Sequence, residues 1–524
     1  MSDSSPLERL ISALQAPAVF DHDVERFEVF ETHISFVLLT GPYAYKFKKP
    51  LDLGFLDFST LEQRRRFCHE ELRLNRRLAP DIYVDVVAVT GSVDSPRLGG
   101  SGMPIEYAVK MVQFPPGDQL DLVTRRGGLR TAHVDQLADD VASFHAGAAS
   151  ADAASGFGRF EAVAEPVRQN FERLAACCAD AGRSDRLHRL REWSEARLKR
   201  DADVFARRRA RGAIRECHGD LHLGNMVLHE GRVAIFDCIE FNADLRWIDT
   251  MSDAAFLIMD LHYHDLARLA HRFLNRYLER SGDYAGLAVL DHYLVYRALV
   301  RAKVACIRAG QDGAAPEQQV AAMKDMDGHL QLAERVVRPR KPRLLITHGL
   351  SGSGKTVVSG RLVEELGAVR LRSDVERKRL AGLDSTARSA SEVAGGLYTR
   401  DMSDRTYAHL LDIARSVIEC GHSVIVDAAF LERARRERFR RLADELRVSF
   451  RIVDVQCGEP ELTRRVQQRA GAGRDASEAG AEVLAHQIRT AEPLDDGERE
   501  QSVVVDTEKQ TNLDAVADAV ASTP

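Results

Sequence analysis

The chain has 524 residues, of which 44% are hydrophobic and 29% charged, so its composition is that of an ordinary folded protein of two or three domains of roughly 100–200 residues each. No apolar run approaches the roughly 18 residues that a membrane span needs, and the first residues lack the pattern of a signal peptide, so we expect a cytoplasmic protein with no membrane association. The formal net charge of −6 argues against a broad nucleic-acid-binding surface.

The first part of the chain begins with short strand-like runs and continues with helical patterns. Turn residues separate the expected strands, and the later segments carry apolar residues at helical spacing. The expected strands are 27–31, 36–40, 43–48 and 106–113, and the expected helices are 64–78, 134–145, 167–178, 186–207 and 291–309. This order predicts an α+β, bilobal, kinase-like domain over 1–336, with a small lobe at about 25–112 and a helical lobe at about 118–336.

A proline-rich joint separates the two parts of the sequence. Residues 338–343 read Arg-Pro-Arg-Lys-Pro-Arg, and two prolines so close together interrupt a helix or a central strand. Beyond the joint, helical segments alternate with apolar runs at 344–347, 423–426, 450–455 and 502–505. This alternation predicts a second domain over 343–524, an α/β fold with a mainly parallel sheet.

One motif in the first part carries the pattern of a phosphoryl-transfer site. Residues 218–225 read His-Gly-Asp-Leu-His-Leu-Gly-Asn, matching the spacing H-x-D-L-x-x-x-N, and an apolar strand then ends at Asp237. Asp220 is the candidate catalytic base, and Asn225 and Asp237 are candidate magnesium ligands. Asp and Asn also cap turns, but the complete set in this order favours catalysis.

This motif resembles the aminoglycoside phosphotransferases and related small-molecule kinases, and the resemblance extends over about 25–310. It implies that Lys46, in Tyr-Ala-Tyr-Lys, contacts ATP phosphates and pairs with Glu70 on the following helix. Lys48, Lys49 and Glu71 are close competitors, because a strand shifted by two residues keeps the same face. Lys110, in Tyr-Ala-Val-Lys, is a further alternative, although its position suggests the strand that enters the interlobe hinge.

Several features bear on the limits of this resemblance. The chain has no G-x-G-x-x-G loop near its N-terminus. Cys238 follows Asp237, unlike the D-F-G motif of protein kinases, which argues against a protein-kinase activation switch. Asp253 resembles an aspartate that supports the catalytic loop, with a helix cap as the alternative. His262 and His264 lack further ligands for a metal. The eight cysteines form no C-x-x-C pair and indicate buried or inert thiols.

The second part opens with a P-loop. Residues 349–356 read Gly-Leu-Ser-Gly-Ser-Gly-Lys-Thr, which fits G-x-x-x-x-G-K-[ST] between an expected strand and an expected helix. A glycine-rich turn is the alternative, but this context favours phosphate binding by backbone N–H groups and Lys355, with Thr356 as a magnesium ligand. The candidate ATP-binding residues here are Gly349, Ser351, Gly352, Ser353, Gly354, Lys355 and Thr356.

The segments after the P-loop resemble the group of P-loop kinases that includes polynucleotide kinases, zeta toxins and gluconate kinases. The resemblance implies that Asp374, after a short strand, is the general base, although it could instead be an N-cap. Asp427 ends a further strand and is a candidate magnesium ligand. Three arginines resemble those of a lid that reaches the phosphates: Arg465, Arg469 and Arg474. The arginine-rich run 432–441 fits an amphipathic surface helix better than a nucleic-acid patch.

The complete arrangement resembles a bacterial family of bifunctional phosphotransferase/ATP-binding proteins. It implies two kinase sites that use ATP and Mg²⁺ and transfer the γ-phosphoryl group to hydroxyl acceptors, most simply small molecules. Three alternatives stay open: a polynucleotide or nucleotide end kinase, a regulatory P-loop ATPase that controls its neighbour, and a binding module with one silent domain. The sequence does not indicate the acceptors, whether both sites are active or coupled, or the oligomeric state.

Overall fold

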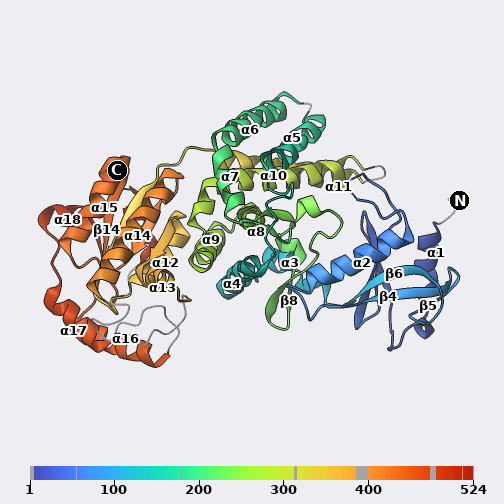
Figure 1. Ribbon diagram of the computed structural model, residues 1–524, viewed down its shortest axis with the longest axis horizontal. Helices are drawn as coiled ribbons and strands as arrows, with labels where there is room; N and C mark the ends of the chain where they lie inside the picture. Colours follow the sequence, from blue (N-terminus) through green and yellow to red (C-terminus); the bar gives the residue numbers. More distant parts are fainter. Residues whose placement is uncertain are drawn as a thin grey trace. The chain divides into compact units, whose positions relative to one another are not determined.

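The computed structural model describes residues 5–54, 56–178, 180–311, 315–384, 399–472, 480–509 and 512–522 (Figure 1). The chain divides into two compact units. The first unit holds Met1–Gln169 and Phe205–Asp260, and the second holds Asn170–Val204 and Leu261–Pro524. The proline-rich joint at 338–343 therefore lies inside the second unit, and the boundary between 336 and 343 stays a prediction about domain organisation.

The first unit is built on an antiparallel sheet with the strand order β1-β2-β3-β6-β4-β5. Its strands are β1 (Glu28–Glu31), β2 (Ser35–Leu39), β3 (Tyr43–Lys48), β4 (Tyr83–Ser92), β5 (Ser95–Leu98) and β6 (Pro104–Val112). One core cluster joins Leu38 and Phe47 of the sheet to Leu10 of helix α1 (Pro6–Ala13). Helix α2 (Leu61–Asn75) begins at Thr60, whose side chain accepts a hydrogen bond from Gln63 N, and packs on β4 and β6. The predicted small β-rich lobe is confirmed.

The first unit also contains, outside this sheet, the loop that carries the kinase-like motif and the elements around it. This remaining part of the unit is made of short strands, 3₁₀ helices and α-helices. Its elements are η1 (Pro17–Val19), η2 (Pro116–Asp118), α3 (Leu120–Arg125), α4 (Thr131–Gly147), β7 (Ile214–Glu216), η3 (Leu223–Asn225), β8 (Met226–His229), β9 (Arg232–Ile235), η4 (Ala243–Leu245) and β10 (Trp247–Asp249). Three helices cross from one unit to the other: α5 (Phe160–Cys177), α7 (Ala202–Ala210) and α8 (Thr250–Tyr263). Strand β7 pairs with β10 and β8 pairs with β9, so the segment between β7 and β8 is held at both ends.

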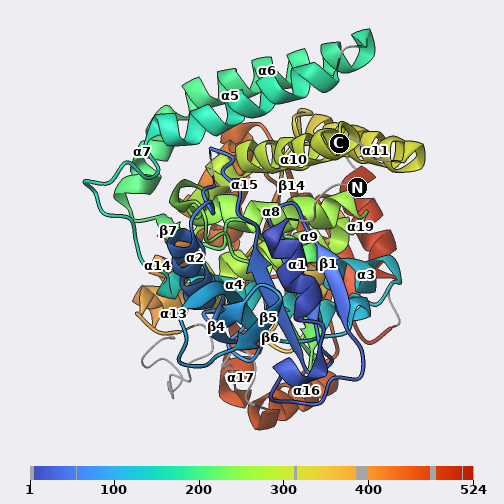
Figure 2. The same cartoon turned by 90° about the vertical axis from the view of Figure 1, so that its right-hand side faces the viewer.

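The second unit begins with helices. These are α6 (Ala181–Arg200), α9 (Ala267–Ser281), η5 (Tyr284–Gly286), α10 (Leu287–Ala309) and α11 (Pro316–Val336), and α10 and α11 lie side by side (Figure 2). A disulfide joins Cys177 at the end of α5 to Cys306 in α10. The expectation that all cysteines are thiols is therefore wrong, because two residues separated by 129 positions can meet only through the tertiary fold. No helix in the described ranges is both long and apolar enough to cross a membrane.

The second unit also contains a five-stranded parallel sheet with the order β12-β13-β11-β14-β15. Its strands are β11 (Arg343–His348), β12 (Val369–Arg372), β13 (Val424–Asp427), β14 (Ser449–Gln456) and β15 (Ser502–Asp506). The helices around it are α12 (Lys355–Leu366), α13 (Ser373–Leu380), α14 (Arg400–Glu419), α15 (Arg433–Leu446), α16 (Glu459–Ala472), α17 (Ala481–Thr490), α18 (Asp496–Glu500) and α19 (Leu513–Ser522). The predicted α/β fold with a parallel sheet is confirmed.

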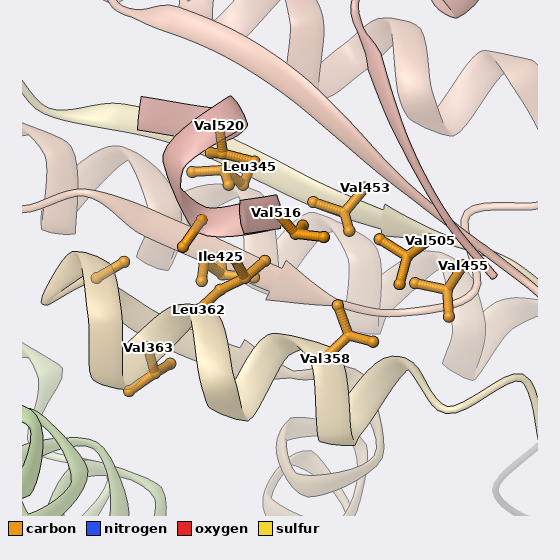
Figure 3. Packing of buried hydrophobic residues seen from close by; sticks show 12 residues of the cluster. Leu345, Val358, Leu362, Val363, Ile425, Val453, Val455, Val505, Val516 and Val520 are labelled. Atoms are coloured by element: carbon orange, nitrogen blue, oxygen red, sulfur yellow. The ribbon is translucent and has the colours of Figure 1, made fainter. Parts of the chain in front are cut away.

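The core of this sheet explains why its strands read as continuous apolar runs. Leu345, Ile425 and Val453 come from three neighbouring strands, and Leu362 of α12 and Val516 of α19 pack against them (Figure 3). Strands of a parallel sheet are covered on both faces, so each position favours an apolar side chain. The central strand β11 ends at the P-loop, which places the predicted phosphate-binding residues at the carboxyl edge of the sheet.

Candidate active sites

The kinase-like loop of the first unit is held by carboxylates from helix α8. Asp253 accepts hydrogen bonds from His218 N at 3.0 Å and Gly219 N at 2.9 Å, and its Oδ2 lies 3.1 Å from His145 Nε2. Gly219 has φ +88°, and a Cβ there would lie 2.6 Å from Leu245 O, so the turn requires glycine. Asp253 therefore supports the loop, as the resemblance implied.

Asp220 and Asn225 are brought into direct contact. Asn225 Nδ2 donates to Asp220 Oδ2 at 2.8 Å and to Asp220 O at 3.0 Å. His222 Nε2 lies 3.3 Å from the same carboxylate oxygen of Asp220. The Asp220 side chain is 35% exposed, so it is oriented by its neighbours and still accessible to an acceptor. This is the arrangement that a base for a substrate hydroxyl requires.

Asp237 lies next to this pair and holds a backbone conformation that costs energy. Phe236 N donates to Asn225 O at 2.9 Å, which brings the end of β9 beside the catalytic loop. The φ of Asp237 is +64°, in the left-handed region that non-glycine residues rarely adopt, and such residues gather at functional sites. Carboxylate and amide oxygens are the ligands that Mg²⁺ prefers, so Asn225 and Asp237 fit the predicted metal site.

Lys46, the predicted phosphate-binding lysine, has a different partner from the predicted one. Lys46 Nζ lies 2.8 Å from Glu71 Oε1 and 2.6 Å from Asp237 Oδ1. Glu71 is fully buried, whereas the Glu70 side chain is 24% exposed and pairs with Arg73 and Arg246. The predicted Lys46–Glu70 pair is therefore corrected to Lys46–Glu71, the competitor named from the sequence.

The helical period explains this correction. Buried positions 68, 71, 72 and 75 follow the i, i+3, i+4, i+7 spacing of one face of α2. One step along a helix turns the side chain by about 100°, so Glu70 points away from the sheet. The apolar Cys68 and Leu72 were the signal in the sequence that could have selected Glu71.

Two lysines, the buried Lys48 and the largely buried Lys46, share the carboxylate of Glu71. Lys48 Nζ donates to Glu71 Oε2 at 2.7 Å and also contacts Glu240, a residue that sequence reasoning missed. Burial opposes ionisation of Glu71, but Lys46 and Lys48 outweigh it and lower the pKa of its carboxyl to about 2. Burial raises the pKa of Glu240, and Lys48 acts against this shift. The cluster keeps both lysines charged beside the place where phosphates would bind.

The alternative lysines point elsewhere. Lys110 Nζ lies 3.9 Å from the centroid of the Tyr43 ring and 3.8 Å from Asp21, and Lys49 pairs with Glu31. Neither contacts the catalytic residues in any interaction that the structure describes. Lys46 is therefore the lysine that reaches Asp237.

The P-loop of the second unit adopts a conformation that only glycine tolerates at several positions. Gly349, Gly352 and Gly354 have φ values of +141°, +87° and +96°, and a Cβ at Gly349 would lie 2.4 Å from Val455 O. Ser351 N donates to Gln487 Oε1 at 2.9 Å. Lys355 Nζ donates to the carbonyls of Gly349 and Leu350 at 2.9 and 2.7 Å. The loop leads directly into α12, whose N-terminus favours anions.

The carboxyl ends of β12 and β13 supply the acidic residues. Arg372 and Asp427 are register partners at the ends of these two strands. Asp427 Oδ2 accepts a hydrogen bond from Ser359 Oγ at 3.0 Å, one turn after Thr356 in α12. Thr356 and Asp427 thus provide oxygen atoms of the kind that Mg²⁺ prefers on one side of the P-loop.

Asp374 lies in the first turn of α13 and accepts a hydrogen bond from Arg377 Nη1 at 2.8 Å. The N-cap position of this helix is occupied by Arg372, so the alternative role of Asp374 as an N-cap is wrong. Asp374 lines a cavity of about 710 Å³ at the P-loop. The predicted residues that line this cavity are Ser351, Gly352, Gly354, Lys355, Thr356, Asp374, Asp427 and Arg465.

Of the predicted lid arginines, Arg465 is placed against the P-loop. Its Nη1 donates to Thr507 Oγ1 at 2.8 Å and to Gly352 O at 3.4 Å, and its Nε donates to Glu461 at 2.7 Å. Arg474 and the side chain of Arg469 lie outside the described residues.

The remaining motifs are structural. Helix α15 buries Arg436, Phe439 and Leu442, and its surface arginines pair with glutamates, as expected of an amphipathic helix. The His262 ring meets the His271 ring edge-on, with 5.5 Å between centroids. The fold also brings His145, Cys217 and Asp253 together, although both oxygens of Asp253 already accept hydrogen bonds from the catalytic loop.

Comparison with known proteins matches each half of the chain to a family. Residues 55–290 match the phosphotransferase enzyme family, and residues 344–494 match an AAA domain. The chain is 32% identical over 487 residues to the uncharacterized protein Rv2004c of Mycobacterium tuberculosis (strain ATCC 25618 / H37Rv), covering 91% of this chain and 94% of that protein.

Two further likenesses concern parts of the chain. A gluconokinase of Gluconobacter oxydans is 30% identical over 175 residues, which cover 32% of this chain and 89% of that enzyme. A solved structure of a Plasmodium vivax ethanolamine kinase is 9% identical and covers 60% of this chain and 82% of that chain, with a TM-score of 0.34. A TM-score this low adds no support to either site.

Proposed function

Since this chain belongs to the family of two-domain proteins that includes Rv2004c and joins a phosphotransferase enzyme family domain to an AAA domain, we propose that it carries two ATP-dependent phosphotransferase sites. Each site moves the γ-phosphoryl group of cytoplasmic ATP to a hydroxyl of a small molecule. The observation that supports the proposal is that each half of the chain brings together a lysine, side-chain oxygens of the kind that bind Mg²⁺ and a partly exposed aspartate.

In the first site, Asp220 is the base for the acceptor hydroxyl. Asn225 orients it through two hydrogen bonds, and Asp253 holds the loop by accepting a hydrogen bond from His218 N. Lys46 stays charged between Glu71 and Asp237 and binds the phosphates. Mg²⁺ held by Asn225 and Asp237 would neutralise charge on the phosphates. This chain therefore contributes mainly positioning and fixed charge to the reaction.

In the second site, the P-loop and Lys355 bind the phosphates, Thr356 and Asp427 would hold Mg²⁺, and Asp374 is the base. Four further arginines line the same cavity: Arg372, Arg377, Arg400 and Arg435. This excess of positive charge beside Asp374 favours an acceptor that carries a carboxylate or phosphate in addition to its hydroxyl. The likeness to a gluconokinase supports a sugar acid as the acceptor.

Two alternatives have specific support in the molecule. The arginine-lined cavity would also accept the end of a polynucleotide, whose binding would weaken steeply with salt. A regulatory ATPase would use the same P-loop and Lys355 without needing Asp374. A kinase is preferred to the ATPase because Asp374 lies in the cavity with Lys355 and Thr356, and a small-molecule acceptor is preferred to a polynucleotide because of the likeness to a gluconokinase.

An acceptor screen with γ-labelled ATP tests the proposal on the full chain. The panel contains sugar acids, neutral sugars, amino sugars, amino alcohols and a 5′-hydroxyl oligonucleotide. Asp220→Asn and Asp374→Asn each silence one proposed site, so transfer lost in one variant alone is assigned to that site. Hydrolysis of ATP without transfer to any acceptor, unchanged in both variants, would contradict two kinase sites.

A further inference from the structure

Helix α9 packs against a part of the chain that lies outside the region matched by the phosphotransferase enzyme family. It lies within residues 55–290, which match the phosphotransferase enzyme family, yet it belongs to the second compact unit with the P-loop sheet. There it packs beside α12 (Figure 1) and also contacts β12. Strand β12 is the first strand of the order β12-β13-β11-β14-β15, so one of its edges has no neighbouring strand.

Asn275 of α9 takes the place of a neighbouring strand at this edge. Its Nδ2 donates to Ala368 O at 3.0 Å, and its Oδ1 accepts a hydrogen bond from Arg370 N at 2.6 Å. The side chain amide thus pairs with one carbonyl and one N–H of the strand, as a peptide group of another strand would. Asn275 is 4% exposed, so α9 covers the edge and excludes water from it.

Glu279, one turn further along α9, begins a chain of contacts that leads to the P-loop. Arg370 donates to Glu279 Oε1 from Nε at 2.9 Å, and its Nη2 lies 2.8 Å from the same oxygen. Arg370 Nη1 also donates to Thr356 O at 3.2 Å and to Ser359 Oγ at 3.4 Å. Ser359 Oγ in turn donates to Asp427 Oδ2 at 3.0 Å.

The contacts of Arg370 therefore end at the two proposed magnesium ligands of the second site. They reach the backbone of Thr356 directly, and they reach the carboxylate of Asp427 through Ser359. Arg370 is 15% exposed and Glu279 is 12% exposed at the side chain, so this ion pair is poorly screened by solvent. Loss of one partner would leave a charge without compensation and let the guanidinium move.

A second contact from the same region reaches the helix that carries the proposed base. Tyr284 Oη, in η5, donates to Glu376 Oε1 at 3.0 Å, and Glu376 is two residues from Asp374 in α13. Glu376 is fully buried. Both strand β12 and helix α13 are thus attached to residues that precede the P-loop match at 344–494.

We propose that Glu279 is a positioning residue of the second kinase site, acting through Arg370 on the Mg²⁺-binding side of the P-loop. The inference rests on the proposed function of that site. It assigns part of the C-terminal active site to a helix of the phosphotransferase half, so the P-loop region requires α9 for metal binding. A purely structural role would predict that Glu279 affects stability alone.

The test measures Mg²⁺-dependent binding of a fluorescent ATP analogue to the full chain. All proteins carry Asp237→Ala, which removes a proposed metal ligand from the first site, and a Lys355→Ala protein supplies the blank. Glu279→Gln removes the charge and keeps the shape. The control is Arg268→Gln, since Arg268 is on the same helix and pairs with Glu365 at 2.7 Å, and it makes no contact with the proposed ligands among the interactions that the structure describes.

We expect Glu279→Gln to raise the Mg²⁺ concentration for half-maximal binding by about 10-fold or more, the usual scale for a residue that orients a metal ligand. Arg268→Gln should leave that concentration within about 2-fold. Glu279→Asp, which restores the charge, should recover part of the loss. An unchanged Mg²⁺ dependence in folded Glu279→Gln would overturn the inference while leaving the proposed function intact.

A second variant keeps the test decisive if Glu279→Gln does not fold. Ser359→Ala breaks the same chain of contacts at its other end and should shift the Mg²⁺ dependence in the same direction. Where both single variants fold, the double variant should raise the Mg²⁺ concentration for half-maximal binding by less than the product of the two single-variant increases, because the residues act through one path. Normal Mg²⁺ dependence in Ser359→Ala would overturn the inference. If the unmodified second site shows no Mg²⁺-dependent binding at all, both the inference and the proposed function of that site fail.

Discussion

Replacing Glu71 with glutamine should damage the first site far more than the same change at Glu70. The carboxyl of Glu71 is fully buried between Lys46 and Lys48, and these lysines, against the effect of burial, lower its pKa from 4.5 to about 2. A pKa difference of this size corresponds to roughly 3 kcal/mol of folding free energy at pH 7. Glu71→Gln should lose most of that stabilisation and leave two buried ammonium groups short of a counter-charge.

The pH dependence follows from the direction of the shift. The pKa of Glu71 is lower in the folded state than in the unfolded state. Its contribution to folding stability is therefore complete at pH values above the unfolded-state pKa, and it is lost as the pH falls toward the folded-state pKa of about 2. The stability difference between the wild type and Glu71→Gln should therefore shrink from roughly 3 kcal/mol at pH 7 to about half that value at pH 3.

Urea unfolding followed by tryptophan fluorescence measures this difference. The chain has 2 tryptophans, and Trp247, stacked on Phe157 at 5.4 Å, belongs to the first unit. A Trp193→Phe background therefore lets Trp247 report on the first unit alone. Glu70→Gln is the matched control, because Glu70 is more exposed and its ion pairs in the described part of the chain are with arginines. A larger loss of stability and of ATP binding in Glu70→Gln than in Glu71→Gln would refute the reasoning.

The other predictions concern both catalytic bases and the joint. Asp220→Asn should lower phosphoryl transfer at the first site by roughly 10²–10⁴-fold with ATP binding retained, whereas Asp237→Ala should weaken Mg·ATP binding; equilibrium binding and single-turnover assays separate the two. Lys355→Ala should impair every ATP-dependent output of the second site, but Asp374→Asn should abolish only transfer; unchanged transfer would remove Asp374 as the base. Limited trypsin digestion should cut first at 338–343. Size-exclusion chromatography should then show that the two pieces stay together, because α9 remains packed on β12. Separation of the pieces under native conditions would contradict that attachment.

The sequence was sufficient where the chemistry depends on residues close together in the chain. The P-loop and the segment from His218 to Asn225 could be recognised because glycine conformations, a short turn and the adjoining helix or strand are local properties. The alternation of helices with apolar strands likewise predicted the parallel sheet, since strands covered on both faces must be apolar.

The tertiary structure decided every pairing between distant segments. It selected Glu71 over Glu70 because only one of two adjacent helical positions can face the sheet, and it added Glu240 as a partner of Lys48. It joined Cys177 to Cys306, which no spacing in the sequence indicated. It also placed Asn275 and Glu279 on the edge strand beside the P-loop. A sequence pattern records which face of an element is buried, but it does not record which other element covers that face, because that choice depends on the packing of the complete chain.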